Sequence, residues 1–151
     1  TEGNMRDMSR MHDVGVAAEE LSFFRDWGGG TVVDVNCIGL MRDVVANRRL
    51  SFETGLNIII GTGFFKIRMS PEMETRTVDD MTEQVIRDIA VGIGNTGSRA
   101  GIIGEVGIEA TPLTPVEIKN ITACSRARPS GPTSEKPAEI VTNPLTPFWP
   151  H

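Results

Sequence analysis

The sequence has no long hydrophobic run, no clustered cysteines and no excess of basic residues. The apolar run Ile58-Ile59-Ile60 is strand-sized, far below the roughly 20 residues that a membrane helix needs. Cys37 and Cys124 lie far apart, which excludes a C-x-x-C metal pair and indicates reduced, structural thiols of a cytoplasmic protein. A net charge of -5 argues against nucleic acid or an anionic membrane as partner, because both bind through clustered Lys and Arg. The polar segment 1–12 carries no signal peptide.

The chain does contain a regular alternation of helical and strand-like patterns. An apolar share of 39% with 16 glycines is enough for a core, and the length suggests one domain. Apolar spacing of three and four residues, with capping and stop signals, predicts helices over 13–27, 42–54, 78–91 and 115–126. Apolar, β-branched stretches predict strands over 31–35, 57–61 and 99–107.

Each helix has a predicted buried face or a terminal signal. For the first three helices we expect the buried faces Val14, Ala17, Ala18, Leu21 and Phe24; Val44, Val45 and Phe52; Val78, Met81, Val85, Ile86 and Ile89. Gly55 predicts the end of the second helix, and Thr77 with Asp80 predicts an N-terminal capping box for the third. Thr114 and Glu117 around Pro115 predict another such box for the fourth.

Strict alternation of helices and strands predicts an α/β fold with a parallel sheet and right-handed crossovers. Either a small doubly wound sheet or part of a (β/α)8 TIM barrel fits, since three strands cannot close a barrel of about 250 residues. The order thus assigns 13–127 to one partial α/β domain, after the polar segment 1–12. The segment 128–151 holds six prolines, including Pro129 and Pro150, and is predicted to be a disordered or loosely attached tail.

Three segments, taken together and in order, resemble the phosphotriesterase family of the amidohydrolase superfamily. The segments are Trp27–Val35 followed by Gly39 and Arg42-Asp43, then Glu53–Phe65, and Arg99–Gly107 followed by Pro112–Pro115. The resemblance runs from about Asp13 to Ala127 and implies strands 2–4 of a TIM barrel, as an internal fragment of a lactonase-like or phosphotriesterase-related protein. It also implies a metal-dependent hydrolase that acts on ester, lactone or phosphotriester bonds of a small molecule.

The resemblance implies a binuclear zinc site at the carboxyl ends of the strands. Family members hold two divalent metals with an H-x-H pair on strand 1, a carboxylate bridge on strand 4, further His on strands 5 and 6, and an Asp on strand 8. Here Glu105 matches the bridge, and a carboxylate between two cations offsets part of their repulsion. Taken alone, a Glu near a strand end is more often solvated or salt-bridged; the resemblance favours the ligand role in the intact parent protein.

The resemblance also implies a substrate pocket beside these strands. Phe65 matches a position where many lactonase-like members place a Tyr against the metals, so the hydroxyl is missing here. Phe64 and Cys37 are further pocket candidates, and ordinary packing under a loop is the alternative for both phenylalanines. No H-x-H occurs, and His12 and His151 match no family ligand, which predicts that this chain alone is catalytically inactive.

Two further interpretations stay open. A non-catalytic half-barrel would leave two open sheet edges and an uncovered face, which favour self-association. A nucleotide-binding module is suggested by the glycine motif Gly92-Ile93-Gly94-Asn95-Thr96-Gly97. That motif follows a predicted helix instead of a strand, so we interpret it as a glycine-rich turn.

Overall fold

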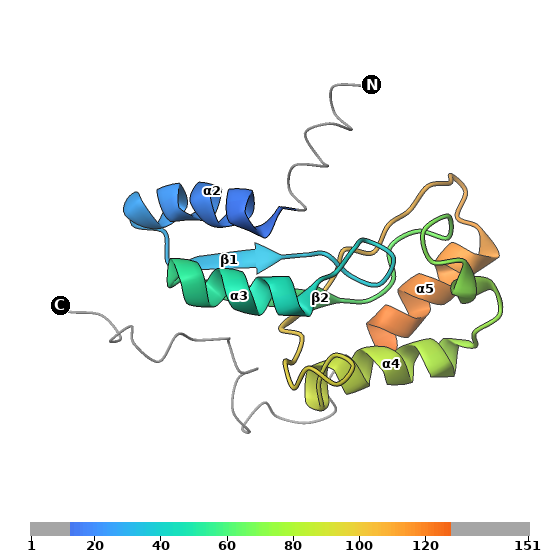
Figure 1. Cartoon of the computed structure of the whole chain (residues 1–151). Coiled ribbons are helices and arrows are strands. Elements are labelled where there is room, and N and C mark those ends of the chain that lie inside the picture. Colours follow the sequence, from blue (N-terminus) through green and yellow to red (C-terminus); the bar gives the residue numbers. More distant parts are fainter. Residues whose placement is uncertain (1–12, 128–151) are drawn as a thin grey trace.

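A computed structural model describes residues 13–127 and contains a three-stranded parallel sheet in the order β1-β2-β3. The elements in chain order are α2 (Val14–Asp26), β1 (Thr31–Asp34), α3 (Val44–Thr54), β2 (Asn57–Thr62), η1 (Pro71–Glu74), α4 (Val78–Ala90), β3 (Ile102–Ile103) and α5 (Pro115–Arg126). Figure 1 shows the two helices α2 and α3 beside the strands and the pair α4 and α5 farther along the chain. The predicted parallel α/β arrangement is therefore confirmed, as an open sheet.

The register of the sheet separates a helix-facing side from an uncovered side. Ile58 and Ile60 of β2 are buried, with 3% and 2% of their surface exposed, and they pair with Val32 and Asp34 of β1. Because successive strand residues alternate between faces, the remaining positions point to the other side. On that side Val33, Val35 and Ile102 are 46%, 41% and 39% exposed. This apolar side lies where the interior of a closed barrel would be.

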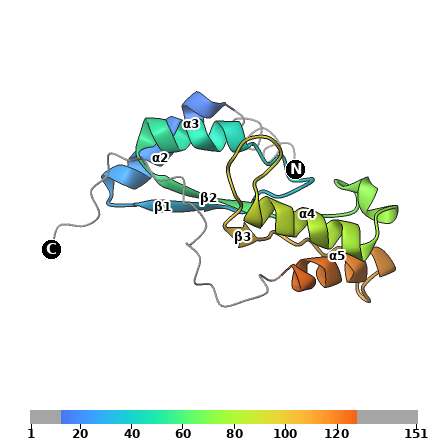
Figure 2. The same ribbon diagram turned by 90° about the horizontal axis from the view of Figure 1, so that it is seen from below.

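Two hydrophobic clusters fill the helix-facing side. The first is centred on Ile58 and Ile60 and is covered by α2 and α3, which Figure 2 shows on the same side of the strands. The second joins α4 and α5 around its buried members Phe64, Met73, Met81, Val85, Ala123 and Ala127. Phe64 follows shortly after β2, so the second cluster lies close to the carboxyl ends of the strands.

Local signals in the sequence agree with the observed helix ends. Gly55 ends α3 in the left-handed conformation, with φ of 74°. Capping boxes are present at α4, between Thr77 and Asp80, and at α5, between Thr114 and Glu117. In each box the hydroxyl accepts a backbone N–H while the carboxylate accepts the N–H of the capping residue, which satisfies donors that a helix start leaves free.

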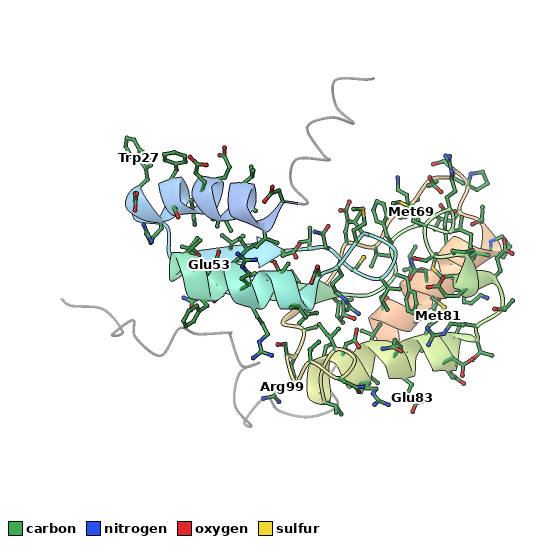
Figure 3. All side chains as sticks on the ribbon, in the orientation of Figure 1. Trp27, Glu53, Met69, Met81, Glu83 and Arg99 are labelled. Atoms are coloured by element: carbon green, nitrogen blue, oxygen red, sulfur yellow. The ribbon has the colours of Figure 1, made fainter. Side chains whose placement is uncertain are left out.

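For four residues the prediction of a buried position was wrong. Phe24, Val45, Phe52 and Ile86 are 44%, 69%, 77% and 42% exposed. In α3 the buried face is instead largely polar, because side-chain hydrogen bonds satisfy it: Ser51 donates to the Leu56 carbonyl and Thr54 to the Leu50 carbonyl. Figure 3 shows one more exposed aromatic residue, Trp27, which extends from the end of α2 and is 90% exposed.

The predicted strand 99–107 is also shorter than expected. Only Ile102–Ile103 pairs with β2, opposite Gly61 and Thr62. The chain then turns at Gly104, whose φ is positive, and leaves the β2 edge. Across residues 13–127 no helix combines the length and apolarity needed to span a membrane. The predictions for 1–12 and 128–151 lie outside the described residues.

Candidate functional site

The carboxyl ends of the three strands are joined by backbone hydrogen bonds into one edge. The loop after β1 pairs with the segment after β2, since Ile38 N donates to Gly63 O at 3.0 Å and Phe65 N donates to Ile38 O at 2.9 Å. The segment after β3 joins them, because Gly107 N donates to Phe65 O at 3.1 Å. Residues from three separate elements therefore meet here, as parallel strands require.

Glu105 lies on this edge, just beyond the end of β3 and not within a strand. Its N–H donates to the carbonyl of Val35, at the end of β1, over 2.9 Å. Its residue surface is exposed. This crossing is possible because Gly61 in the central strand has no side chain: a Cβ there would lie 2.5 Å from the Gly104 carbonyl oxygen. Glu105 is thus fixed by its backbone, while its carboxylate remains open to solvent.

Cys37 lies beneath the backbone of Glu105. Its side chain is fully buried, and Sγ donates to the Glu105 carbonyl at 3.0 Å. Burial raises the pKa of the Cys37 thiol to about 11, so the sulfur is protonated at neutral pH. A protonated thiol is a poor nucleophile. Cys37 therefore supports the edge from below instead of offering a reactive group.

The two phenylalanines after β2 have different surroundings. Phe64 is 0% exposed and belongs to the α4–α5 cluster, so it packs as a core residue and has no surface for a substrate. Phe65 is half-buried, and the ammonium group of Lys66 lies 5.1 Å from its ring centroid. The stem of Lys66 lies against Gly107, where a Cβ would clash with Lys66 Cγ. The edge thus brings together Glu105, Cys37 and Phe65, but not the side chain of Phe64.

The residues of the edge do not form a complete metal site by themselves. Among residues 13–127 no three side chains of His, Cys, Asp or Glu are grouped so as to hold a metal ion. Glu105 offers one carboxylate, whereas a zinc site needs at least three protein ligands. Residues 13–127 therefore do not complete a metal centre.

Sequence reasoning missed a buried charge next to this edge. Asp88 on α4 is 0% exposed and forms a 2.7 Å ion pair with Arg42, from the loop after β1. The sequence did contain a signal, because Asp88 follows Met81 and Val85 on the buried face of α4. A carboxylate on an apolar stripe requires a specific partner.

A second carboxylate was predicted only as a cap. Glu117 accepts the N–H groups of Glu109 at 2.6 Å and Ala110 at 3.1 Å, besides that of Thr114 at 2.7 Å. These bonds, with the Thr114 hydroxyl, lower the pKa of Glu117 to about 2. Glu117 therefore holds the loop after Glu105 against α5.

The glycine motif of residues 92–97 forms the turn between α4 and β3. Gly92, Gly94 and Gly97 all have positive φ. The turn is closed by the N–H of Ile93, which donates to the Ser98 carbonyl at 2.8 Å. It follows a helix and precedes a strand, so it lies at the amino end of β3, away from the edge that carries Glu105.

Comparisons with known proteins agree with this architecture. The sequence profile of the Phosphotriesterase family matches residues 4–145. The chain is 32% identical to an N-acetyltaurine hydrolase of Xenopus tropicalis over 83% of this chain and 36% of that protein. Among solved structures, a resiniferatoxin-binding protein from Rhodobacter sphaeroides has a TM-score of 0.73 at 33% identity, with 76% of this chain and 32% of that chain covered. A lactonase from Listeria monocytogenes has a TM-score of 0.68 at 28% identity, with 76% and 40% covered. The chain spans about a third of the length of the curated relatives it matches.

Proposed function

Because the chain belongs to the phosphotriesterase family, we propose that it forms strands 2–4 of the catalytic barrel of a metal-dependent hydrolase. The bond cleaved is an ester, lactone or phosphotriester of a small molecule. Two observations support this assignment: the sheet is parallel with one uncovered apolar face, and the relatives include a lactonase and an N-acetyltaurine hydrolase. A lactone and an N-acetyl group both carry an acyl carbon, so an amide is a further substrate class to test.

In this proposal Glu105 is one metal ligand, the carboxylate that bridges two divalent ions, zinc by family resemblance. Its position on the carboxyl edge is the observation that supports the role, since catalytic groups of (β/α) barrels lie on that edge. Phe65 forms a wall of the substrate pocket. Cys37 borders the pocket from beneath the Glu105 backbone. The described residues alone complete no metal centre.

We propose further that this polypeptide alone is inactive. Its 151 residues contain two histidines, and neither belongs to an H-x-H pair. The test is to purify the full chain, measure bound zinc by mass spectrometry, and assay a lactone, a carboxylester, a phosphotriester and N-acetyltaurine with added zinc. We expect substoichiometric zinc and no turnover above that of Glu105→Gln. Stoichiometric zinc with turnover lost in Glu105→Gln would overturn the proposed inactivity and support the ligand role.

The parent activity has a separate test in the encoding DNA. Read in all frames, the flanking DNA is expected to encode an H-x-H pair upstream, and two histidines and an aspartate downstream. Absence of all these ligands would contradict an enzymatic parent. Buried, unpaired Cys37 and Cys124 support a reducing compartment, and we propose the cytoplasm.

A non-catalytic, self-associating half-barrel is the second candidate. It is favoured by the uncovered face with Val33, Val35 and Ile102. Sedimentation of the full chain tests it, with Val33→Lys as the disrupting variant and Val45→Lys, on the outer surface of α3, as the matched control. Dissociation by the first variant alone supports this candidate. A concentration-independent monomer refutes it.

A further inference from the structure

One buried carboxylate connects three parts of the fold. Asp88 Oδ2 accepts from the Arg42 guanidinium and from the Thr62 hydroxyl, both at 2.7 Å. Asp88 Oδ1 accepts from the Gln84 amide at 2.9 Å. The three donors lie on different elements: Arg42 in the loop after β1, Thr62 at the end of β2, and Gln84 on α4. The carboxylate therefore fixes their relative positions.

Arg42 makes this connection from the loop after β1. Its side chain is 12% exposed, and the same nitrogen that contacts Asp88 also donates to the Gly61 carbonyl at 3.2 Å. Gly61 is the residue over which the backbone of Gly104 and Glu105 crosses. The ion pair thus secures the loop 35–43 against the central strand, directly beside that crossing.

The secured loop is the support of the candidate site. Val35 accepts the N–H of Glu105, and Cys37 donates to the Glu105 carbonyl, so both backbone groups of Glu105 are bonded to the same loop. Ile38 bonds to the segment after β2 through both its N–H and its carbonyl. Displacement of this loop would move Glu105 with it.

We propose that Arg42 and Asp88 are positioning residues, which hold the loop 35–43 and through it set the location of Glu105. A buried ion pair adds little net stability over apolar residues of similar size, because desolvation offsets the attraction. Its planar, directional hydrogen bonds do fix geometry. Any effect of this pair on catalysis rests on the proposed function of Glu105. Its role in fixing the position of the loop 35–43 does not.

The test uses the two buried cysteines of the full chain as reporters. Cys37 lies in the secured loop, whereas Cys124 lies in α5. A substitution that lowers global stability accelerates the modification of both thiols by the same factor, since both react from the unfolded state. Local release of the loop accelerates Cys37 alone. The measured quantity is the ratio of the two modification rates with a thiol reagent, assigned by peptide mass spectrometry.

The deciding variants are Arg42→Met and the double variant Arg42→Met with Asp88→Asn. The single change leaves Asp88 charged without its partner, while the double change removes both charges and keeps an oxygen for Thr62, which preserves folding. We expect both to raise the Cys37 to Cys124 rate ratio about tenfold or more. Arg49→Met is the matched control, because Arg49 forms an exposed ion pair with Glu53 on α3, and its ratio should equal that of the wild type.

Two results would overturn the proposal. One is an equal acceleration of both thiols, and the other is a double variant with the wild-type ratio. Neither depends on bound metal or turnover, so a failure of the proposed hydrolase function leaves this test unaffected.

Discussion

Replacement of Gly61 by alanine is expected to displace the Glu105 backbone from the carboxyl edge. The Cβ of alanine would lie 2.5 Å from the Gly104 carbonyl oxygen and 3.2 Å from those of Asn36 and Asp34. Comfortable contacts between such atoms begin near 3.5 Å, so the Gly104 backbone must move by about 1 Å. Gly61 does not have a positive φ, so the backbone conformation itself suits alanine.

The magnitude follows from the bonds that this movement breaks. The Glu105 N to Val35 O bond of 2.9 Å and the Cys37 Sγ to Glu105 O bond of 3.0 Å both lengthen beyond bonding range. Each hydrogen bond contributes about 0.5–1.5 kcal/mol, which gives a loss of about 1–3 kcal/mol. The lower entropy of the unfolded alanine chain returns about 0.4–1 kcal/mol. We expect a net decrease of about 1–2 kcal/mol in the free energy of unfolding.

Urea denaturation followed by circular dichroism measures that loss, and the modification rate of Cys37 relative to Cys124 reports the local displacement. Gly30→Ala is the matched control, because a Cβ at Gly30 meets no atom within 4 Å and φ is not positive there. It should be neutral or slightly stabilising. A Gly61→Ala protein with wild-type stability and an unchanged thiol ratio would refute the proposed close approach of Gly104.

Three other expectations concern stability. The pKa of Glu117 is about 2 in the folded state against 4.5 ordinarily, so its contribution to stability is complete above about pH 4.5 and is lost as the pH falls toward 2. The free energy of unfolding should therefore fall with pH across that range in the wild type, and this pH dependence should be absent in Glu117→Gln. Met81→Ala, at a fully buried site, should cost about 2–5 kcal/mol in urea unfolding, whereas Ile86→Ala, with 42% exposure, should cost about 0.5 kcal/mol or less. Gly39→Ala should cost about 1–3 kcal/mol in the same assay, because φ is +85° and its Cβ would lie 2.8 Å from the Met69 carbonyl oxygen.

Local sequence signals were sufficient for the order of the main helices and strands and for the C-terminal end of α3 and the N-terminal ends of α4 and α5. A capping box depends on residues three positions apart, so Thr114 and Glu117 could be paired from the sequence alone. The burial of a helix face is different, because it depends on which neighbour covers it. In α3 the polar Asn47 is 8% exposed and bonds to Asp34 of β1, whereas the apolar Phe52 is 77% exposed. The spacing of hydrophobic residues along a helix cannot predict a partner that is distant in the sequence.

At the candidate site, too, the position of a residue could be predicted from the sequence, but the contacts that fix it could not. That Glu105 lies at the carboxyl edge followed from its place late in the predicted strand 99–107 of a parallel sheet. What fixes it there, the loop 35–43 and the pair of Arg42 with Asp88, joins residues 46 positions apart and required the structure. The sequence nevertheless marked both contact points by residues that contradict their surroundings: a glycine at position 61 in a buried strand, and a carboxylate at position 88 on a buried helix face. Such a residue weakens its own element, so its presence indicates a close approach or a specific partner. Here both indications lead to the same loop, the one that holds Glu105.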